Sequence, residues 1–150
     1  MDNIVIKKKN KPINKTMKNT TNKTGKSKNL KTQMVEMFLD MLNTVKLYHW
    51  KTYVYAKHEA TDELYQELNK HIDMFMEVLM GKDETRIPNG SIRLDLKNTS
   101  SDQEYKNKIY GYRTFLQNME KMGVHDTDLL NIRDEILGKL NQFLYLLTFK

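Results

Sequence analysis

Residues 57–80 read KHEATDELYQELNKHIDMFMEVLM, and this stretch decides the fold. Its large apolar side chains recur at intervals of three and four residues, at Leu64, Leu68, Ile72, Phe75, Met76 and Leu79. That spacing puts them on one side of an α-helix, so the stretch predicts an amphipathic helix. Gly81 follows at the position where a glycine commonly ends a helix.

The same periodicity predicts a helix before this one. It covers about 32–51, with Thr32 as a candidate N-cap. Its apolar residues are Met34, Val35, Phe38, Met41, Leu42, Val45 and Tyr48. The β-branched and aromatic residues at 52–55 predict a helix end or a bend between the two helices.

Two more helices are predicted in the second half of the chain. One begins near Ser101, where Glu104 is placed to form a capping box, and stops at Gly123. The other follows Asp126 and runs to about residue 148. Residues 82–100 contain Pro88, Asn89-Gly90 and a Ser/Thr cluster, which predict a long loop. Four helices with one long connection predict an all-α, ferritin-like four-helix bundle over 32–150.

The composition excludes several classes of protein. A chain of 150 residues suits one domain, and 2 Pro and 6 Gly are too few for an all-β fold rich in tight turns. The absence of Cys excludes disulfides, thiolate zinc sites, iron–sulfur clusters and thiol nucleophiles. No stretch approaches the roughly 18 apolar residues of a membrane span. No apolar signal core follows the N-terminal basic residues, so we do not expect secretion by that route.

Positive charge is concentrated at the N-terminus. Residues 1–31 hold ten lysines and one acid, Asp2, and so carry +9; because the whole chain carries +6, residues 32–150 carry −3. The lysines are Lys7, Lys8, Lys9, Lys11, Lys15, Lys18, Lys23, Lys26, Lys28 and Lys31. The segment has almost no large apolar side chains, which predicts a disordered tail. A basic tail on an acidic body favours DNA as a partner, bound through phosphates without base recognition. A solubilising or targeting tail is the alternative.

The 57–80 helix also carries a polar stripe. His58 and Asp62 are four residues apart, as are Asp73 and Glu77. Asp62 and Asp73 are eleven apart, close to three helical turns, so both pairs share one face. The rise between them is about 16 Å. Metal ligands lie within roughly 2–2.5 Å of an ion, so the two pairs cannot serve one ion within one chain.

A two-fold axis removes this difficulty. If the helix packs antiparallel against its copy, His58 and Asp62 of one chain face Asp73 and Glu77 of the other, and two identical sites form. His49, near the end of the preceding helix, could add a third ligand from the first chain. Two imidazoles and three carboxylates suit Fe(II), Mn(II) or Zn(II), and the carboxylate share favours iron. The alternative is an ordinary solvated helix face.

Three segments resemble the Dps family, the mini-ferritins. They are 47–50 (LYHW), 58–65 (HEATDELY) and 72–77, which ends the pattern with Asp73 and Glu77. That family has His-Trp at the end of its first helix, then His-x-x-x-Asp and, eleven residues later, Asp-x-x-x-Glu on the second. Residues 126–130 and 140–147 also look like the last helix of the family. The resemblance covers about 32–150.

The resemblance implies an iron-storing ferroxidase. Dps proteins oxidise Fe(II), usually with hydrogen peroxide, at sites shared by two subunits, and store the ferric product in a shell of typically twelve. DNA-binding members carry a Lys-rich N-terminus. Carried over, His49, His58 and Asp62 would come from one chain and Asp73 and Glu77 from its partner. Trp50 would be the adjacent aromatic that takes up stray oxidising equivalents.

The chain departs from the family pattern in two places. His49 and His58 are nine residues apart where the family usually has twelve. The helix that the family usually has in its long connection is not evident in 82–100, so a dimer or a smaller cage stands beside the expected dodecamer. An intrachain di-iron centre of the larger ferritins would need Glu-x-x-His, which the sequence lacks.

Two further hypotheses remain beside the ferroxidase. One is an architectural DNA-compacting protein on a mini-ferritin scaffold whose iron site is weakened or lost. The other is an oligomeric bundle that the tail merely solubilises. The heavy use of Lys and Asn, the short turn and the tail look more like a ferritin-like protein of a large DNA virus than a bacterial one. We expect the protein in the cytoplasm or on the nucleoid or, if its source is viral, in the virion.

Overall fold

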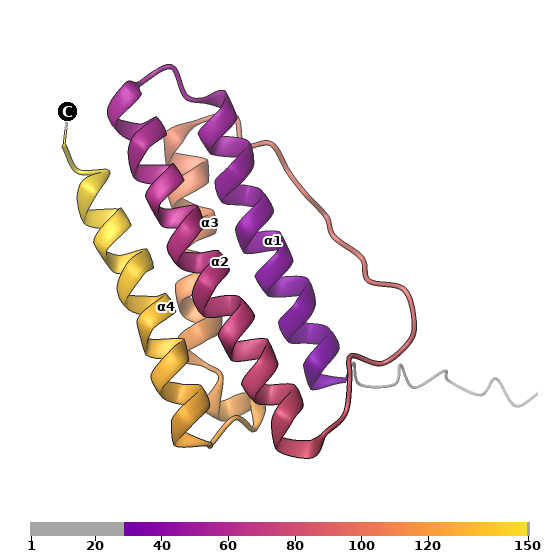
Figure 1. Cartoon of the computed structure of the whole chain (residues 1–150). Helices are drawn as coiled ribbons and strands as arrows, with labels where there is room; N and C mark the ends of the chain where they lie inside the picture. Colours follow the sequence, from indigo (N-terminus) through magenta and orange to yellow (C-terminus); the bar gives the residue numbers. More distant parts are fainter. Residues whose placement is uncertain (1–28, 150) are drawn as a thin grey trace, which may run out of the picture.

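Four helices form an all-α bundle in the computed structural model, which describes residues 29–149 (Figure 1). They are α1 (Leu30–Lys51), α2 (Tyr55–Asp83), α3 (Asp102–Gln117) and α4 (Thr127–Leu146), with a short 3-10 helix, η1 (Glu120–Met122), before α4. The described residues contain no β-strand. The prediction of an all-α bundle is therefore confirmed.

Contacts between helix ends give the direction of each helix. The start of α1 meets the end of α2 where the ammonium of Lys31 lies 2.6 Å from a carboxylate oxygen of Asp83. The end of α1 meets the start of α3 where the hydroxyl of Tyr48 donates to Asp102 at 2.7 Å. Lys82, near the end of α2, pairs with Asp128 at the start of α4. Helices α1 and α4 therefore run one way, and α2 and α3 run the other (Figure 1).

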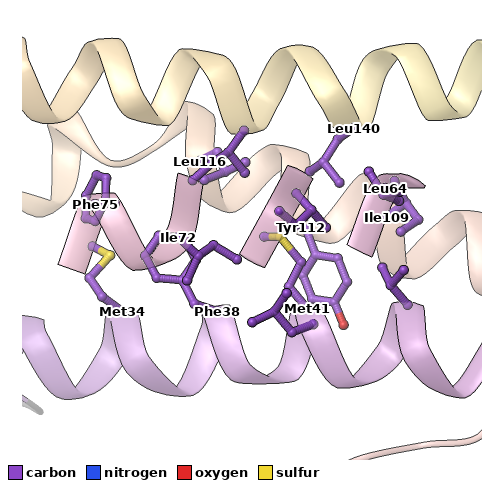
Figure 2. Close-up of a cluster of buried hydrophobic side chains, with 14 of the residues drawn as sticks. Met34, Phe38, Met41, Leu64, Ile72, Phe75, Ile109, Tyr112, Leu116 and Leu140 are labelled. Carbon is purple, nitrogen blue, oxygen red and sulfur yellow. The ribbon is translucent and has the colours of Figure 1, made fainter. Parts of the chain in front are cut away.

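The apolar stripes of the four helices meet in one core. Figure 2 shows Met34, Phe38 and Met41 of α1 beside Ile72 and Phe75 of α2. The rings of Phe38 and Phe75 pack edge to face with centroids 5.3 Å apart. Most of the predicted apolar side chains in each helix are buried. The exceptions are partly buried: Leu79 of α2 and Leu130, Ile132 and Leu144 of α4. Their burial supplies most of the stability of such helices.

The first helix begins earlier than the sequence predicts. Asn29, not Thr32, is the N-cap, and its side chain accepts a hydrogen bond from the backbone N–H of Lys31. Lys31 lies in the first turn of α1, is buried, and pairs with Asp83 and Thr85. The boundary of the tail at residue 31 is therefore wrong, because the Asp83 carboxylate draws this lysine into the bundle.

The second helix continues past Gly81 to Asp83, and Glu84 takes the left-handed cap with φ of 53°. The expected stop at Gly81 is wrong. Lys82 pairs with Asp126 and Asp128 of the facing α4 end, and these tertiary contacts hold the last turn in place. Helix propensity is a weak preference that such contacts override.

The last two helices also differ from their predicted ends. The hydroxyl of Ser101 accepts from the backbone N–H of Glu104, as a capping box requires, but the Glu104 carboxylate accepts from Ser100 instead of Ser101. α3 ends at Gln117, and η1 and the left-handed Gly123 complete the turn. α4 ends at Leu146 and not at 148.

Residues 84–101 connect α2 to α3 and contain neither helix nor strand. In Figure 1 this segment runs beside α1 along the length of the bundle. The segment must span this length, because α3 starts at the end of the bundle opposite to the end where α2 finishes. Among the helices described, none is long and apolar enough to cross a membrane.

Candidate metal centre at the α1–α2 junction

Two histidines lie against each other where α1 passes into α2. The rings of His49 and His58 stack with centroids 3.9 Å apart and an interplanar angle of 24°. Nδ1 of His49 lies 3.1 Å from the backbone oxygen of His58, and Nδ1 of His58 lies 3.1 Å from that of His49. The turn at 52–54 is short, and it is this shortness that lets each ring reach the other residue's main chain.

These contacts fix which ring nitrogen carries the proton. A backbone carbonyl only accepts hydrogen bonds, so Nδ1 of both histidines must be the N–H donor. In the neutral ring, Nε2 of each then keeps its lone pair. Metal-binding histidines typically donate their second ring N–H to a carbonyl or carboxylate in this manner. The arrangement therefore presents two imidazole nitrogens able to bind a cation.

Asp62 completes this half of the predicted set. Its Oδ1 lies 4.0 Å from Nε2 of His49 and 3.8 Å from the ammonium of Lys46. Its Oδ2 accepts a hydrogen bond from the side chain of Gln66 at 2.9 Å. The structure thus brings together His49, His58 and Asp62, as the sequence predicts. Lys46 reduces the negative charge at the carboxylate.

Thr61 and Lys46 are contributors that the sequence reasoning missed. The Thr61 hydroxyl is buried, lies within donating distance of the backbone oxygens of Lys57 (2.7 Å) and His58 (2.9 Å), and is 3.3 Å from Nδ1 of His49. Lys46 also lies over the ring of Tyr65, 4.2 Å from its centroid. The sequence offers one signal for these two residues. Thr61 follows His58 by three residues and Lys46 precedes His49 by three, so each lies within one helical turn of a candidate ligand.

Asp73 and Glu77 lie apart from the histidine cluster. Both are exposed, and they share no hydrogen bond or ion pair with any other residue that the structure describes. Eleven residues of helix separate Asp62 from Asp73, which corresponds to about 16 Å. Within residues 29–149 of one chain, no three His, Asp or Glu are arranged to hold an ion. The two halves can meet only through a second chain.

An apolar groove of about 280 Å³ lies beside Asp73, between α1 and α2. Its lining is Val35, Phe38, Leu39, Leu42, Asn69, Ile72, Asp73, Met76 and Ile87. Leu39, which lines this groove, is 38% exposed, and Trp50, next to His49, is 71% exposed. The groove therefore offers apolar surface beside Asp73.

A hydrogen-bonded cluster fixes the end of α1 that carries His49. Burial raises the pKa of Tyr48, whose hydroxyl donates to Asp102. The Lys57 ammonium, and then the Tyr48 hydroxyl, lower the pKa of Asp102. The cluster joins the last turn of α1, the first turn of α2 and the start of α3, and so connects the two helix ends that carry His49 and His58.

The predicted DNA-binding lysines Lys7 to Lys28 lie outside the described residues, and only Lys31 falls within them.

The chain belongs to the family of unknown function DUF5856, whose model matches residues 49–147. That range holds all five candidate ligands and Trp50, and it excludes the basic N-terminus. No curated protein and no solved structure matches the chain.

Proposed function

We propose that this protein is a Dps-like ferroxidase and iron store, in which Fe(II) is the substrate and His49, His58, Asp62, Asp73 and Glu77 are its ligands. The observation that carries the proposal is the reciprocal pair of hydrogen bonds between His49 and His58. These bonds leave the lone pair of Nε2 available on both rings, and Nε2 of His49 lies 4.0 Å from the Asp62 carboxylate. A solvated helix face has no reason to fix two imidazoles in this tautomer.

The site is complete only across a two-fold axis. An antiparallel contact between two copies of α2 puts Asp73 and Glu77 of one chain at His58 and Asp62 of the other. The groove beside Asp73 supplies apolar surface for this contact, and the exposed Trp50 adjoins it from the partner's side. Two such sites per dimer follow from the symmetry.

The chemistry needs two electrons from two ions. Two Fe(II) and one hydrogen peroxide, with two protons, give two Fe(III) and two water molecules. The imidazole nitrogens and carboxylates bind the cations, and the proximity of two ions lets one peroxide accept both electrons in one encounter. The carboxylates also offset the added charge of the ferric product.

The topology supports a ferritin-like assignment. Bundles of this type have one long crossover between their second and third helices, which makes those two helices parallel. The chain has its long connection at 84–101, and α2 and α3 run in the same direction. The dodecameric or smaller shell belongs to the same proposal.

Mixing two variants tests the shared site. Asp62→Ala and Glu77→Ala should each lower the rate of Fe(II) oxidation by peroxide more than about 100-fold, given that even outer-shell changes cost 10–100-fold. The mixed protein should recover about a quarter of the wild-type rate, because half of the dimers are mixed and each holds one intact site. Glu135→Ala, which removes an exposed acid on α4 away from the stripe, is the control. No recovery on mixing, with dimers formed, would refute the shared site.

We further propose that the N-terminal lysines, Lys7 to Lys28, bind DNA through its phosphates. The support is the +9 charge of residues 1–31 against −3 for the rest of the chain. Removal of residues 1–28 should abolish binding to duplex DNA, and wild-type affinity should fall steeply as salt rises. Equal affinity of the truncated protein, measured by fluorescence anisotropy, would contradict the tail model.

A DNA-compacting protein with a weakened iron site is the second candidate. The observation that favours it is the ammonium of Lys46, 3.8 Å from Asp62, because a cation there opposes the binding of another. The same peroxide assay separates the two: oxidation no faster than in buffer, together with tail-dependent DNA binding, supports this candidate.

A further inference from the structure

Residues 91–97 of the long connection read SIRLDLK and have the pattern of a β-strand. Ile92, Leu94 and Leu96 alternate with Arg93 and Asp95, which is the period of two that a half-buried strand requires. The structure gives this segment no strand partner among the described residues. The three apolar side chains remain 37%, 36% and 42% exposed.

The main chain of this segment has little hydrogen bonding. Within the described part of the chain, the one main-chain bond of residues 91–97 is from the N–H of Arg93 to the carboxylate of Glu36, at 3.4 Å. An exposed main chain with alternating side chains is a template for pairing with another strand.

The sequence of the segment is complementary to itself. In an antiparallel pair with Leu94 opposite Leu94, Arg93 of each copy faces Asp95 of the other, and Ile92 faces Leu96. Opposite charges and apolar pairs at directly opposed positions stabilise antiparallel strands. A shift by one residue would place Arg93 opposite Leu94, and the match would be lost.

We propose that residues 91–97 pair with the same segment of a second copy of this chain, as a two-stranded antiparallel ribbon with Leu94 on the two-fold axis. Each dimer then contains two Arg93–Asp95 pairs and one isologous strand contact. This interface adds to the helical contact of the proposed ferroxidase and does not depend on iron.

One axis can carry both contacts. Leu94 lines a pocket with Asp40, which lies near the middle of α1. The midpoint of the α2 stripe lies at Leu68, near the middle of α2. Both segments therefore lie at the central level of the bundle, as one two-fold axis perpendicular to the helices requires.

Single cysteines test the register, because the chain has none of its own. In the full-length, metal-free protein, Leu94→Cys should form an intermolecular disulfide within minutes of adding an oxidant. Opposed residues in antiparallel strands have Cα atoms about 4.5–5.5 Å apart, within disulfide range. Ile92→Cys alone should not cross-link, because its two copies are about 13 Å apart. A mixture of Ile92→Cys and Leu96→Cys chains should.

Cross-linking of Leu94→Cys no faster than that of Ile92→Cys would overturn the proposal, as would failure of the mixture. Wild-type Fe(II) oxidation with that result would leave the proposed function intact. Rapid cross-linking with no oxidation would sustain the strand pairing and refute the ferroxidase.

Charge exchange provides a second test that does not rely on cysteine. Arg93→Asp places two Asp residues opposite each other in both pairs, and Asp95→Arg places two Arg residues opposite. Each single change should weaken dimer formation about ten-fold, as measured by sedimentation. The double exchange, Arg93→Asp with Asp95→Arg, restores opposite charges and should restore the affinity. A double variant as weak as either single one would overturn the register.

Discussion

The two halves of the α2 stripe differ in how much of their geometry one chain provides. His58 and Asp62 lie at the α1–α2 junction, where stacking, main-chain hydrogen bonds and Lys46 fix their positions. Asp73 and Glu77, with the same four-residue spacing, are exposed and have no such partners among residues 29–149. Equal spacing in sequence therefore gives one half that is organised by the fold and another that a second chain has to complete.

This difference separates stability from function. Residues in the organised half contribute to both the folding of the chain and the binding of a cation. Residues in the exposed half contribute to the proposed site alone. Substitutions at matched positions of the two halves should show the distinction directly.

The largest effect on stability is expected at His49. This side chain is 9% exposed, stacks on His58 and bonds to its main chain, so His49→Ala should lower the free energy of unfolding by about 1–3 kcal/mol. Asp73→Ala should change it by less than about 0.5 kcal/mol, because it removes an exposed side chain. Urea unfolding of the metal-free proteins measures both. Equal losses would remove the distinction between the two halves.

A smaller effect is expected at Thr61, which holds both histidines in place. Thr61→Val keeps the shape but removes the hydroxyl that bonds to the His58 carbonyl and to His49. Stability should fall by about 1 kcal/mol. Affinity for Fe(II) should fall about ten-fold, the lower end for a group that supports a ligand. Thr61→Ser retains the hydroxyl and should bind Fe(II) with wild-type affinity. Titration of each protein with Fe(II) under anaerobic conditions measures this affinity. A Ser variant that binds Fe(II) as weakly as the Val variant would show that the hydroxyl alone does not account for the effect.

The smallest effect is expected at the opposite end of the bundle, at Asp83. The Lys31 ammonium, followed by Thr85, lowers the pKa of this carboxyl to about 2. A lowered pKa stabilises the fold at pH values above the unfolded pKa of roughly 4, and the contribution is lost as pH falls through about 2. Asp83→Asn should therefore lower the melting temperature slightly at pH 6, and this difference should shrink as the pH falls toward 2. Glu135→Gln, an exposed acid, is the control. A difference in melting temperature of the same size at pH 2 as at pH 6 would contradict the ion-pair explanation.

The sequence predicted the helical core well and the helix ends poorly. Leu64, Leu68 and Phe75 were identified because burial of one face imposes a period of 3.6 residues that is legible in the sequence. The ends of α1 and α2 were misplaced because the Lys31–Asp83 pair, 52 residues apart, extends both helices. Such a contact leaves no local pattern.

The candidate site shows the same division. The spacing from His58 to Glu77 selected the acidic and imidazole residues, because helical periodicity alone puts them on one face. Local spacing did not reveal that the short 52–54 turn stacks His49 on His58, or that Thr61 of α2 reaches His49 and Lys46 of α1 reaches Asp62 across the two helices. These contacts depend on the packing angle and register of two helices.

By itself, then, the sequence determined which faces of the helices are buried, where the charge lies and which residues could bind a cation, because each follows from composition and short-range periodicity. The tertiary structure decided where the helices end, which ring nitrogen of His49 and His58 donates, and that Arg93 and Asp95 lie on a segment with few main-chain hydrogen bonds. Those features arise from contacts between residues distant in sequence, and these contacts form only when the four helices pack into the bundle.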